Sequence, residues 1–227
     1  MIKIEEIMTY GWEEAIRGMR NPMNSWDKSD SHYGCYMGHD EPPHDCSYCP
    51  DICGAYNSNY LIGPKDHELM MKLGNAGNDH AKFLRMITVY MDITAPLYWW
   101  KEFDTYKVGT VANSCSTMHK IHAKEFELDD FSCEHLIDFS WNRLYDTIKH
   151  LNYYREKYIE TKNKEDWWQM IQLLPSSYNQ KRTVQLNYAV LKNMYHSRKN
   201  HKLDEWHDFC KMIEELPYSE LITGERA

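Results

Sequence analysis

The sequence predicts an α/β (α+β) fold in which a central antiparallel or mixed sheet is flanked by long helices, with a cysteine-rich inserted loop. Apolar residues recur with helical spacing through most of the second half of the chain, whereas residues 86–94 alternate apolar and polar side chains, as a strand does. In addition, 42% of the 227 residues are hydrophobic and 14% are aromatic, which is enough to form a core. We therefore expect a single domain over residues 1–227, with residues 21–63 as the cysteine-rich loop.

The first part of the chain predicts a strand, a short helix and a long loop. Residues 2–8 (IKIEEIM) alternate apolar and charged side chains, which is typical of a strand at the edge of a sheet. Residues 9–20 are expected to form a helix capped by Thr9, and its apolar stripe consists of Trp12, Ala15, Ile16 and Met19. Residues 21–63 are rich in Gly, Pro, Ser, Asn and Asp and show no sustained period, so we expect a long loop there.

Four cysteines lie in this loop, at Cys35, Cys46, Cys49 and Cys53. Four thiolates from one segment can hold a tetrahedral zinc ion or an iron–sulfur cluster, and a metal would give one structure to a stretch with little apolar content. The spacing is not that of a double Cys-x2-Cys motif, so free thiols and disulfides stay open as alternatives.

Further elements follow along the chain. We expect a helix over residues 63–77 that ends at Gly74 or Gly77, and then the strand of residues 86–94. Another helix should begin at Ala95-Pro96 and run to about Thr105, since proline suits a first helical turn. Later apolar stripes predict helices over residues 134–161, 165–173, 183–196 and 203–216. The stripe of the first of these helices includes Leu136, Phe139, Leu144, Ile148, Leu151 and Tyr158.

The segment 95–121 combines apolar anchors with polar groups. Trp99 and Trp100 stand directly beside a charged set consisting of Lys101, Glu102, Asp104 and Lys107. Such a combination favours a pocket for a polar, partly aromatic ligand, with Lys107 facing a phosphate and Glu102 ordering a ring nitrogen. The alternative is an amphipathic helix whose charges form ordinary pairs three residues apart.

A run of small polar residues follows this charged set. Gly109 permits close backbone approach, and the hydroxyls that follow, including those of Thr110 and Ser116, can bind a phosphate. Cys115 lies within the run and is either a nucleophile activated by a neighbouring cation or a small apolar side chain.

Composition narrows the class of protein. The net charge of −8 argues against a nucleic-acid binder, and no apolar run approaches the 18 or so residues that a membrane span needs. The first residues lack the pattern of a signal peptide, and the number of cysteines, seven, is odd. We therefore expect reduced thiols in a cytoplasmic protein that binds neither membrane nor nucleic acid.

The order of the predicted elements resembles that of the flavin-dependent thymidylate synthases. A strand is followed by an Ala-Pro…Trp-Trp helix, a polar turn, a helix pair, Leu174-Pro175 and two amphipathic helices. The resemblance covers about Asp66 to Pro217, and it is strongest in the segment LLPSSYNQKRTVQLNYAVLKNMYHSRKNHKLDEW. It implies the fold of that family, a homotetramer, and synthesis of dTMP from dUMP with FAD, NADPH and methylenetetrahydrofolate.

The resemblance also implies roles for residues at the matching positions. Arg198 would contact the nucleotide as the catalytic residue, and Asn187, Asn193 and His80 would contact the flavin. An Arg-His-Arg triplet in the family aligns with Thr105-Tyr106-Lys107, where Lys107 alone keeps a cation for a cofactor phosphate. The remaining substrate-binding positions on this reading are Glu102, Cys115 and Ser116.

The sequence therefore favours a divergent FAD-dependent thymidylate synthase-like methyltransferase that acts on C5 of dUMP. A pyrimidine nucleotide hydroxymethylase on the same scaffold is one alternative. A non-catalytic nucleotide-binding protein without flavin is another, because most of the triplet is replaced.

Overall fold

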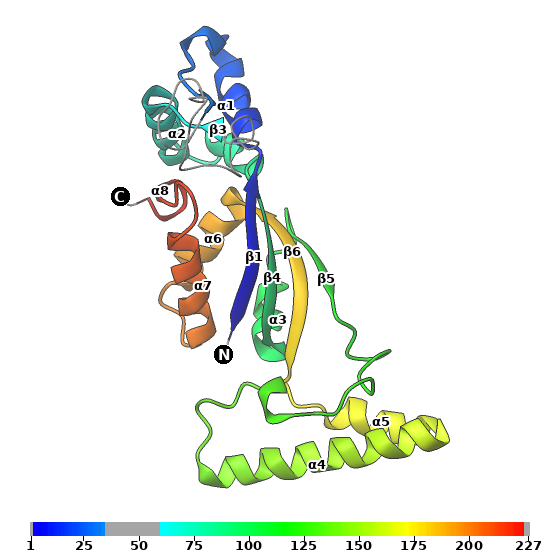
Figure 1. Ribbon diagram of the computed structural model, residues 1–227. Helices are drawn as coiled ribbons and strands as arrows, with labels where there is room; N and C mark the ends of the chain where they lie inside the picture. Colours follow the sequence, from blue (N-terminus) through cyan, green and yellow to red (C-terminus); the bar gives the residue numbers. More distant parts are fainter. Residues whose placement is uncertain (1, 35–59, 225–227) are drawn as a thin grey trace, which may run out of the picture. The chain divides into compact units, whose positions relative to one another are not determined.

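The computed structural model describes residues 2–34 and 60–224 (Figure 1). The chain groups into two compact units, which we describe one at a time. As far as their residues are described, the first is built from Met1–Met8, Tyr90–Leu186 and Ser197–Ile213, and the second from Thr9–Val89, Asn187–His196 and Glu214–Ala227. The expectation of a single domain stays a prediction.

A four-stranded sheet, whose strands lie mainly in the first unit, has the order β1-β4-β6-β5. The strands are β1 (Lys3–Tyr10), β4 (Thr88–Pro96), β6 (Asn179–Asn187) and β5 (Val111–Ser114). β5 is antiparallel to β6, with Val111 opposite Gln185. The sequence prediction of an edge strand at the start of the chain is confirmed, since β1 lies at one end of this order.

Apolar side chains on one face of the sheet are buried as the alternation in β4 predicts. Met91 and Ile93 of β4 are buried, as are Val184 and Leu186 of β6. α3 (Leu97–Phe103) and α7 (Asp204–Glu214) supply an aromatic cluster, in which Trp99 lies 4.8 Å from Trp206 between ring centroids. The other members of this cluster are Trp100, Phe103 and Phe209. Trp99 and Trp100 therefore form core rather than the wall of a pocket.

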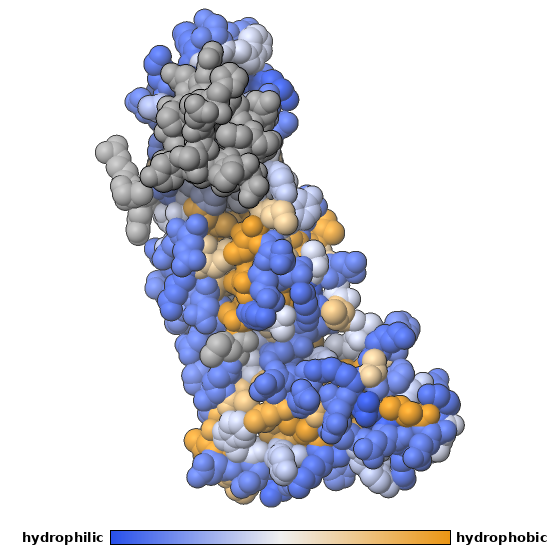
Figure 2. All heavy atoms as spheres, in the orientation of Figure 1, coloured by the Kyte–Doolittle hydropathy of each residue, from blue (hydrophilic) through white to orange (hydrophobic). Residues whose placement is uncertain are grey.

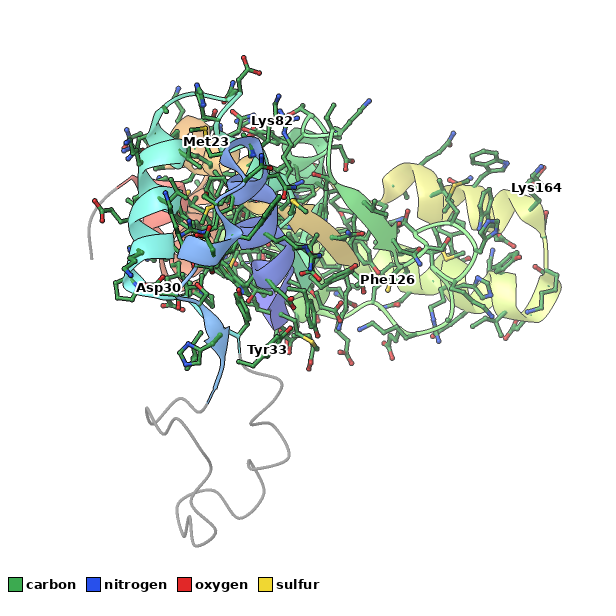
Figure 3. The ribbon with its side chains drawn as sticks, turned by 90° about the horizontal axis from the view of Figure 1, so that it is seen from above. Met23, Asp30, Tyr33, Lys82, Phe126 and Lys164 are labelled. Atoms are coloured by element: carbon green, nitrogen blue, oxygen red, sulfur yellow. The ribbon has the colours of Figure 1, made fainter. Side chains whose placement is uncertain are left out.

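A helix pair at the end of the first unit has its own core. α4 (Asp138–Thr161) and α5 (Lys164–Leu173) run side by side in opposite directions (Figure 1), and Lys164 marks the tip of the pair (Figure 3). The core residues shared by the pair and its connecting segments include Phe126, Phe131, Leu144, Ile148, Leu151 and Met170. Apolar residues also reach the surface of this part (Figure 2), and Phe139, predicted for the buried stripe, is 72% exposed.

The second unit contains short helices and a small sheet. The helices are α1 (Trp12–Arg20), α2 (Pro64–Asn75), α6 (Tyr188–Arg198, whose last two residues belong to the first unit) and α8 (Glu220–Thr223). The 3-10 segments η1 (Asn21–Met23), η2 (Trp26–Lys28) and η4 (Ala81–Arg85) connect them, while η5 (Leu128–Asp130) belongs to the first unit. β2 (His32–Tyr33) and β3 (Tyr60–Leu61) form a small antiparallel sheet. The ring of Trp12 lies 5.2 Å from that of Tyr188, which ties α1 to the start of α6.

Four predicted helices begin later than expected. α3 begins at Leu97, because Ala95 and Pro96 still belong to β4, and α4 begins at Asp138 rather than at residue 134. Thr9 belongs to β1, and α1 begins only at Trp12, because Gly11 turns the chain with φ 90°. A Cβ at Gly11 would lie 2.2 Å from the carbonyl oxygen of Met86, so this close approach also requires glycine. The predicted helix over 183–196 is wrong in its first part: residues through Asn187 belong to β6, where Val184 and Leu186 alternate with more exposed neighbours.

Over the described residues, no helix has the length and apolar character that crossing a membrane requires.

Candidate functional site

Glu102, at the end of α3, is the centre of a polar cluster in the first unit. Its Oε2 accepts a hydrogen bond from Arg198 Nη1 at 2.8 Å and another from Trp206 Nε1 at 2.9 Å. His201 Nε2 lies 3.2 Å from the same oxygen. All of these groups approach one oxygen, and Oε1 accepts no hydrogen bond from the part of the chain that the structure describes.

Arg198, at the end of α6, is held from several sides. Its Nε donates to the hydroxyl of Tyr106 at 2.9 Å, and its guanidinium carbon lies 5.0 Å from the centroid of the Trp206 ring. The side chain is 19% exposed. Within the described ranges Nη2 has no partner, so a fixed and partly accessible cation retains one donor group for a ligand.

A backbone N–H group fixes the tautomer of His201. The N–H of Leu203 donates to His201 Nδ1 at 3.2 Å, so Nδ1 must be unprotonated. In the neutral ring the proton is then on Nε2, the atom that faces Glu102. His201 therefore presents a donor to the carboxylate without serving as a base.

Lys107 lines a cavity of about 350 Å³ that adjoins this cluster through Tyr106. Its other lining residues are Phe103, Asp104, Thr110 and Ala112. Thr110 Oγ1 is buried and finds no hydrogen-bond partner among the described residues, while Gly109 turns the chain with φ 79°. A cation beside an unpaired hydroxyl suits a phosphate oxygen, so these residues fit the phosphate of a nucleotide or of FAD.

Arg182 of β6 is a second cation of this region, which the sequence did not single out. It stacks over the ring of Trp100 at 4.2 Å and forms a 2.8 Å ion pair with Asp104. Its Nε also donates to Gln180 at 3.0 Å. Arg182 therefore contributes to packing and neutralises Asp104, next to the cavity of Lys107.

Tyr98 and Glu205 connect α3 to α7 in the same unit. The Tyr98 hydroxyl donates a short hydrogen bond to Glu205, which is itself buried. Burial, followed by this hydrogen bond, raises the pKa of Tyr98 well above its ordinary value. The phenol therefore stays protonated and positions the helix that carries Trp206.

The side chain of Ser116 has a structural role in this arrangement, whereas Cys115 contributes only its backbone. The backbone carbonyl of Cys115 accepts from Gln180 Nε2 at 2.7 Å, and its thiol is free and exposed. Ser116 Oγ accepts from the backbone N–H groups of Met118 and His119, at 3.2 and 2.8 Å, and so closes a local turn. Their proposed contacts with substrate stay predictions.

The three predicted flavin contacts belong to the second unit. Asn187 Oδ1 accepts from the backbone N–H of Val190 at 3.0 Å and caps α6, while its amide nitrogen has no partner among the described residues. Asn193 and His80 are exposed, on α6 and directly before η4. Their roles are untested, as is that of Lys107.

The four predicted metal ligands, Cys35, Cys46, Cys49 and Cys53, lie outside the described residues. Within residues 2–34 and 60–224, no group of His, Cys, Asp and Glu side chains is arranged to hold a metal ion.

The structure thus joins Glu102 and Arg198, which the sequence predicted separately, and adds Tyr106, His201 and Trp206 to them. Arg198 and Trp206 stand 96 and 104 positions from Glu102, so no local pattern could reveal these contacts. Tyr106 was named only as the middle residue of the replaced triplet, and helical spacing does not link it to Glu102, because α3 ends at Phe103.

The fold and the site together define an α+β protein with an arginine–carboxylate cluster partly open to ligand. Its fold is that of the flavin-dependent thymidylate synthases. Thymidylate synthase X from Helicobacter pylori, with FAD and dUMP, superposes with a TM-score of 0.64 at 18% identity over 97% of this chain and 96% of that chain. A further flavin-dependent thymidylate synthase structure from Helicobacter pylori, complexed with FAD and dUMP, gives 0.63 at 17% identity over 96% of each chain. The predicted resemblance is confirmed for the fold.

The UMP/dUMP methylase PolB from Streptomyces cacaoi, bound with 5-Br dUMP, is also similar, with a TM-score of 0.55 at 10% identity over 94% of this chain and 88% of that one. No protein-family model matches the sequence, and no curated protein matches it. The likeness is therefore one of structure rather than of sequence.

Proposed function

We propose that this protein is a divergent flavin-dependent thymidylate synthase-like enzyme that transfers a one-carbon unit to C5 of dUMP. Methylenetetrahydrofolate supplies the carbon, NADPH the reducing equivalents, and the product is dTMP. One observation carries the proposal: Glu102 and Arg198, predicted separately for the nucleotide, meet in one cluster on this fold. The structural neighbours from Helicobacter pylori, which hold FAD and dUMP, support it.

Arg198 is the residue on which the proposal depends most. Tyr106 and Glu102 fix the guanidinium through Nε and Nη1, at 2.9 and 2.8 Å, so Nη2 is held in place before a ligand arrives. A fixed donor of this kind binds a pyrimidine carbonyl and stabilises the negative charge that develops on the ring during attack from C5.

FAD, when bound, supplies the hydride chemistry of this reaction. Lys107 and the hydroxyl of Thr110, which has no partner among the described residues, suit one of its phosphates. His80, Asn187 and Asn193 are the further proposed contacts, with Cys115 and Ser116 proposed beside the nucleotide. We also propose that the protein acts as a homotetramer, as the resemblance implies, and in the cytoplasm, as its cysteine content suggests.

The first test is the visible spectrum of the purified protein with added FAD, followed by product analysis. With dUMP, NADPH and methylenetetrahydrofolate we expect dTMP, identified by its mass. A hydroxymethylated nucleotide would replace the proposal by the hydroxymethylase alternative. Binding of dUMP by a protein that takes up no FAD would support a non-catalytic nucleotide-binding protein instead.

Complementation of a thymidine-requiring strain tests the site in cells. The wild-type gene should allow growth without thymidine, and Arg198→Ala should not. Lys211→Ala is the matched control, since Lys211 is an exposed cation that pairs only weakly with Asp208, at 3.5 Å. Growth with Arg198→Ala at the wild-type level would overturn the assignment of Arg198.

A further inference from the structure

The carboxylate of Glu102 is arranged asymmetrically, and this asymmetry suggests what it recognises. Arg198 and Trp206 both donate to Oε2, at 2.8 and 2.9 Å, and His201 Nε2 also faces this oxygen. Oε1 accepts nothing from the described residues, although the side chain is 33% exposed. The cluster therefore orients a carboxylate so that one oxygen is bound and the other is left for a ligand.

We infer that Glu102 Oε1 accepts a hydrogen bond from the ring N3–H of a uracil-type base, and that His201 and Trp206 are positioning residues for it. The inference rests on the proposed function, which brings a pyrimidine nucleotide to this cluster. An ionised carboxylate is an acceptor only, so its ligand must offer a donor. In uracil the ring N3 carries that donor, whereas in cytosine N3 is an acceptor.

The surrounding donors cannot reverse their roles. Arginine and the tryptophan indole have no acceptor atom in their polar groups, and the Leu203 N–H, 3.2 Å from His201 Nδ1, keeps the His201 proton on Nε2. An amide at position 102 would therefore have to direct its carbonyl oxygen toward Arg198 and Trp206. Its NH2 group would then occupy the place of Oε1.

Glu102→Gln should consequently exchange an acceptor for a donor at one fixed point. Wild-type protein should bind dUMP more tightly than dCMP, and methylation of dUMP at N3 should abolish this advantage. In Glu102→Gln the preference should reverse toward dCMP, whose N3 accepts from the amide. For one hydrogen bond to a charged group we expect each preference to be roughly 10- to 100-fold.

The experiment measures dissociation constants of dUMP, dCMP, N3-methyl-dUMP and 3′-deoxy-dUMP by calorimetry for wild type, Glu102→Gln and Asp208→Asn. Asp208→Asn removes the same charge from an exposed position of α7, so it controls for net charge and should keep the wild-type preference. Thermal unfolding establishes that each variant is folded. His201→Ala and Trp206→Phe should weaken the preference for dUMP over dCMP.

Three results would overturn the inference. One is an unchanged dUMP preference in folded Glu102→Gln. A second is that N3-methyl-dUMP binds as tightly as dUMP while 3′-deoxy-dUMP does not bind. Oε1 would then contact the 3′-hydroxyl of the sugar instead of the base. The third is equal binding of dUMP and dCMP by wild-type protein. Failure to bind any pyrimidine nucleotide would instead overturn the proposed function itself, so the two failures are distinguishable.

Discussion

The pair of Arg20 and Asp66 in the second unit and the pair of Arg198 and Glu102 in the first differ in how many of their polar atoms have partners. In the second unit, Arg20 Nε donates to Asp66 Oδ1 at 2.6 Å, and Oδ2 of Asp66 accepts from the hydroxyls of Ser29 and Ser31, at 2.6 Å each. Both remaining Arg20 nitrogens donate to backbone carbonyls, those of Ser25 and Lys28, at 3.1 Å. Asp66 and Arg20 are 0% and 5% exposed, so this pair is closed.

The pair formed by Glu102 and Arg198 is open by the same criteria. Its side chains are 33% and 19% exposed, and Oε1 of one and Nη2 of the other have no partner among the described residues. An ion pair by itself therefore does not mark a functional site. Unused donors and acceptors on fixed, accessible groups do.

The closed pair is next to a further structural contact. The carboxylate of Asp30 accepts from the backbone N–H groups of Lys65 and Asp66, at 2.9 and 3.1 Å, and so caps the first turn of α2 (Figure 3). The side-chain nitrogens and oxygens of Arg20, Asp66 and Asp30 therefore all have partners within the described residues.

The largest expected effect follows from breaking the closed pair. Arg20→Ala leaves the buried carboxylate of Asp66 without its cation, and loss of one partner of a buried pair reduces the free energy of unfolding by about 3–5 kcal/mol. Urea unfolding followed by circular dichroism measures this loss. A reduction below about 1 kcal/mol would contradict the closed character of the pair.

The same substitution in the open pair should act on activity instead. Arg198→Ala removes a cation that is partly solvated, so we expect the free energy of unfolding to fall by about 1 kcal/mol. Loss of one fixed donor to a developing charge should lower the kcat of dTMP formation roughly 100- to 1000-fold. Steady-state kinetics with dUMP measure it, and Arg17→Ala, an exposed cation of α1, serves as the control.

Because of the closed pair, the free energy of unfolding should also depend on pH in the acid range. Burial raises the pKa of the Asp66 carboxyl, but the hydrogen bonds from Ser29, Ser31 and Arg20 outweigh burial, and the net pKa is lowered. The unfolded chain then binds the proton first, near pH 3.9, so the stabilisation is complete above about pH 4 and is lost as the pH falls through the folded pKa. The difference in unfolding free energy between wild type and Asp66→Asn should therefore shrink below about pH 4. A difference that stays constant from about pH 6 to pH 3 would contradict it.

Sequence reasoning succeeded where a local pattern decided the structure. The alternation around Met91 and Ile93 marked β4, and the stripe with Leu144, Ile148 and Leu151 marked α4. β5 was not predicted, because all four of its residues are exposed and the sequence therefore shows no alternation of apolar and polar residues there. The second half of β6 was predicted as helix, because the helical spacing of apolar residues in α6 continues upstream of Tyr188.

The candidate site was only half predictable for a related reason. Arg198 and Glu102 could be singled out by residue type and by resemblance, whereas His201 and Trp206 became recognisable only through their distance from Glu102. The closed pair was missed altogether, because Arg20 and Asp66 are 46 positions apart and each reads as an ordinary helix residue.

The smallest expected effect concerns Thr110, whose buried hydroxyl lacks a partner among the described residues. Loss of the Ser29 or Ser31 hydroxyl would remove a hydrogen bond from Asp66. Thr110→Val instead replaces a hydroxyl without a partner among the described residues by a methyl group of similar size. We therefore expect the free energy of unfolding to stay within about 0.5 kcal/mol of wild type, or to rise.

If the Thr110 hydroxyl donates to a phosphate of FAD, its loss should weaken FAD binding roughly three- to tenfold, measured by flavin fluorescence. Thr147→Val, which removes a hydroxyl already bonded to the Arg143 carbonyl at 2.8 Å, is the matched control and should leave FAD binding unchanged. Equal FAD affinity in wild type and Thr110→Val would mean that the cavity of Lys107 holds no phosphate, and the open character of the site would then rest on Glu102 and Arg198 alone.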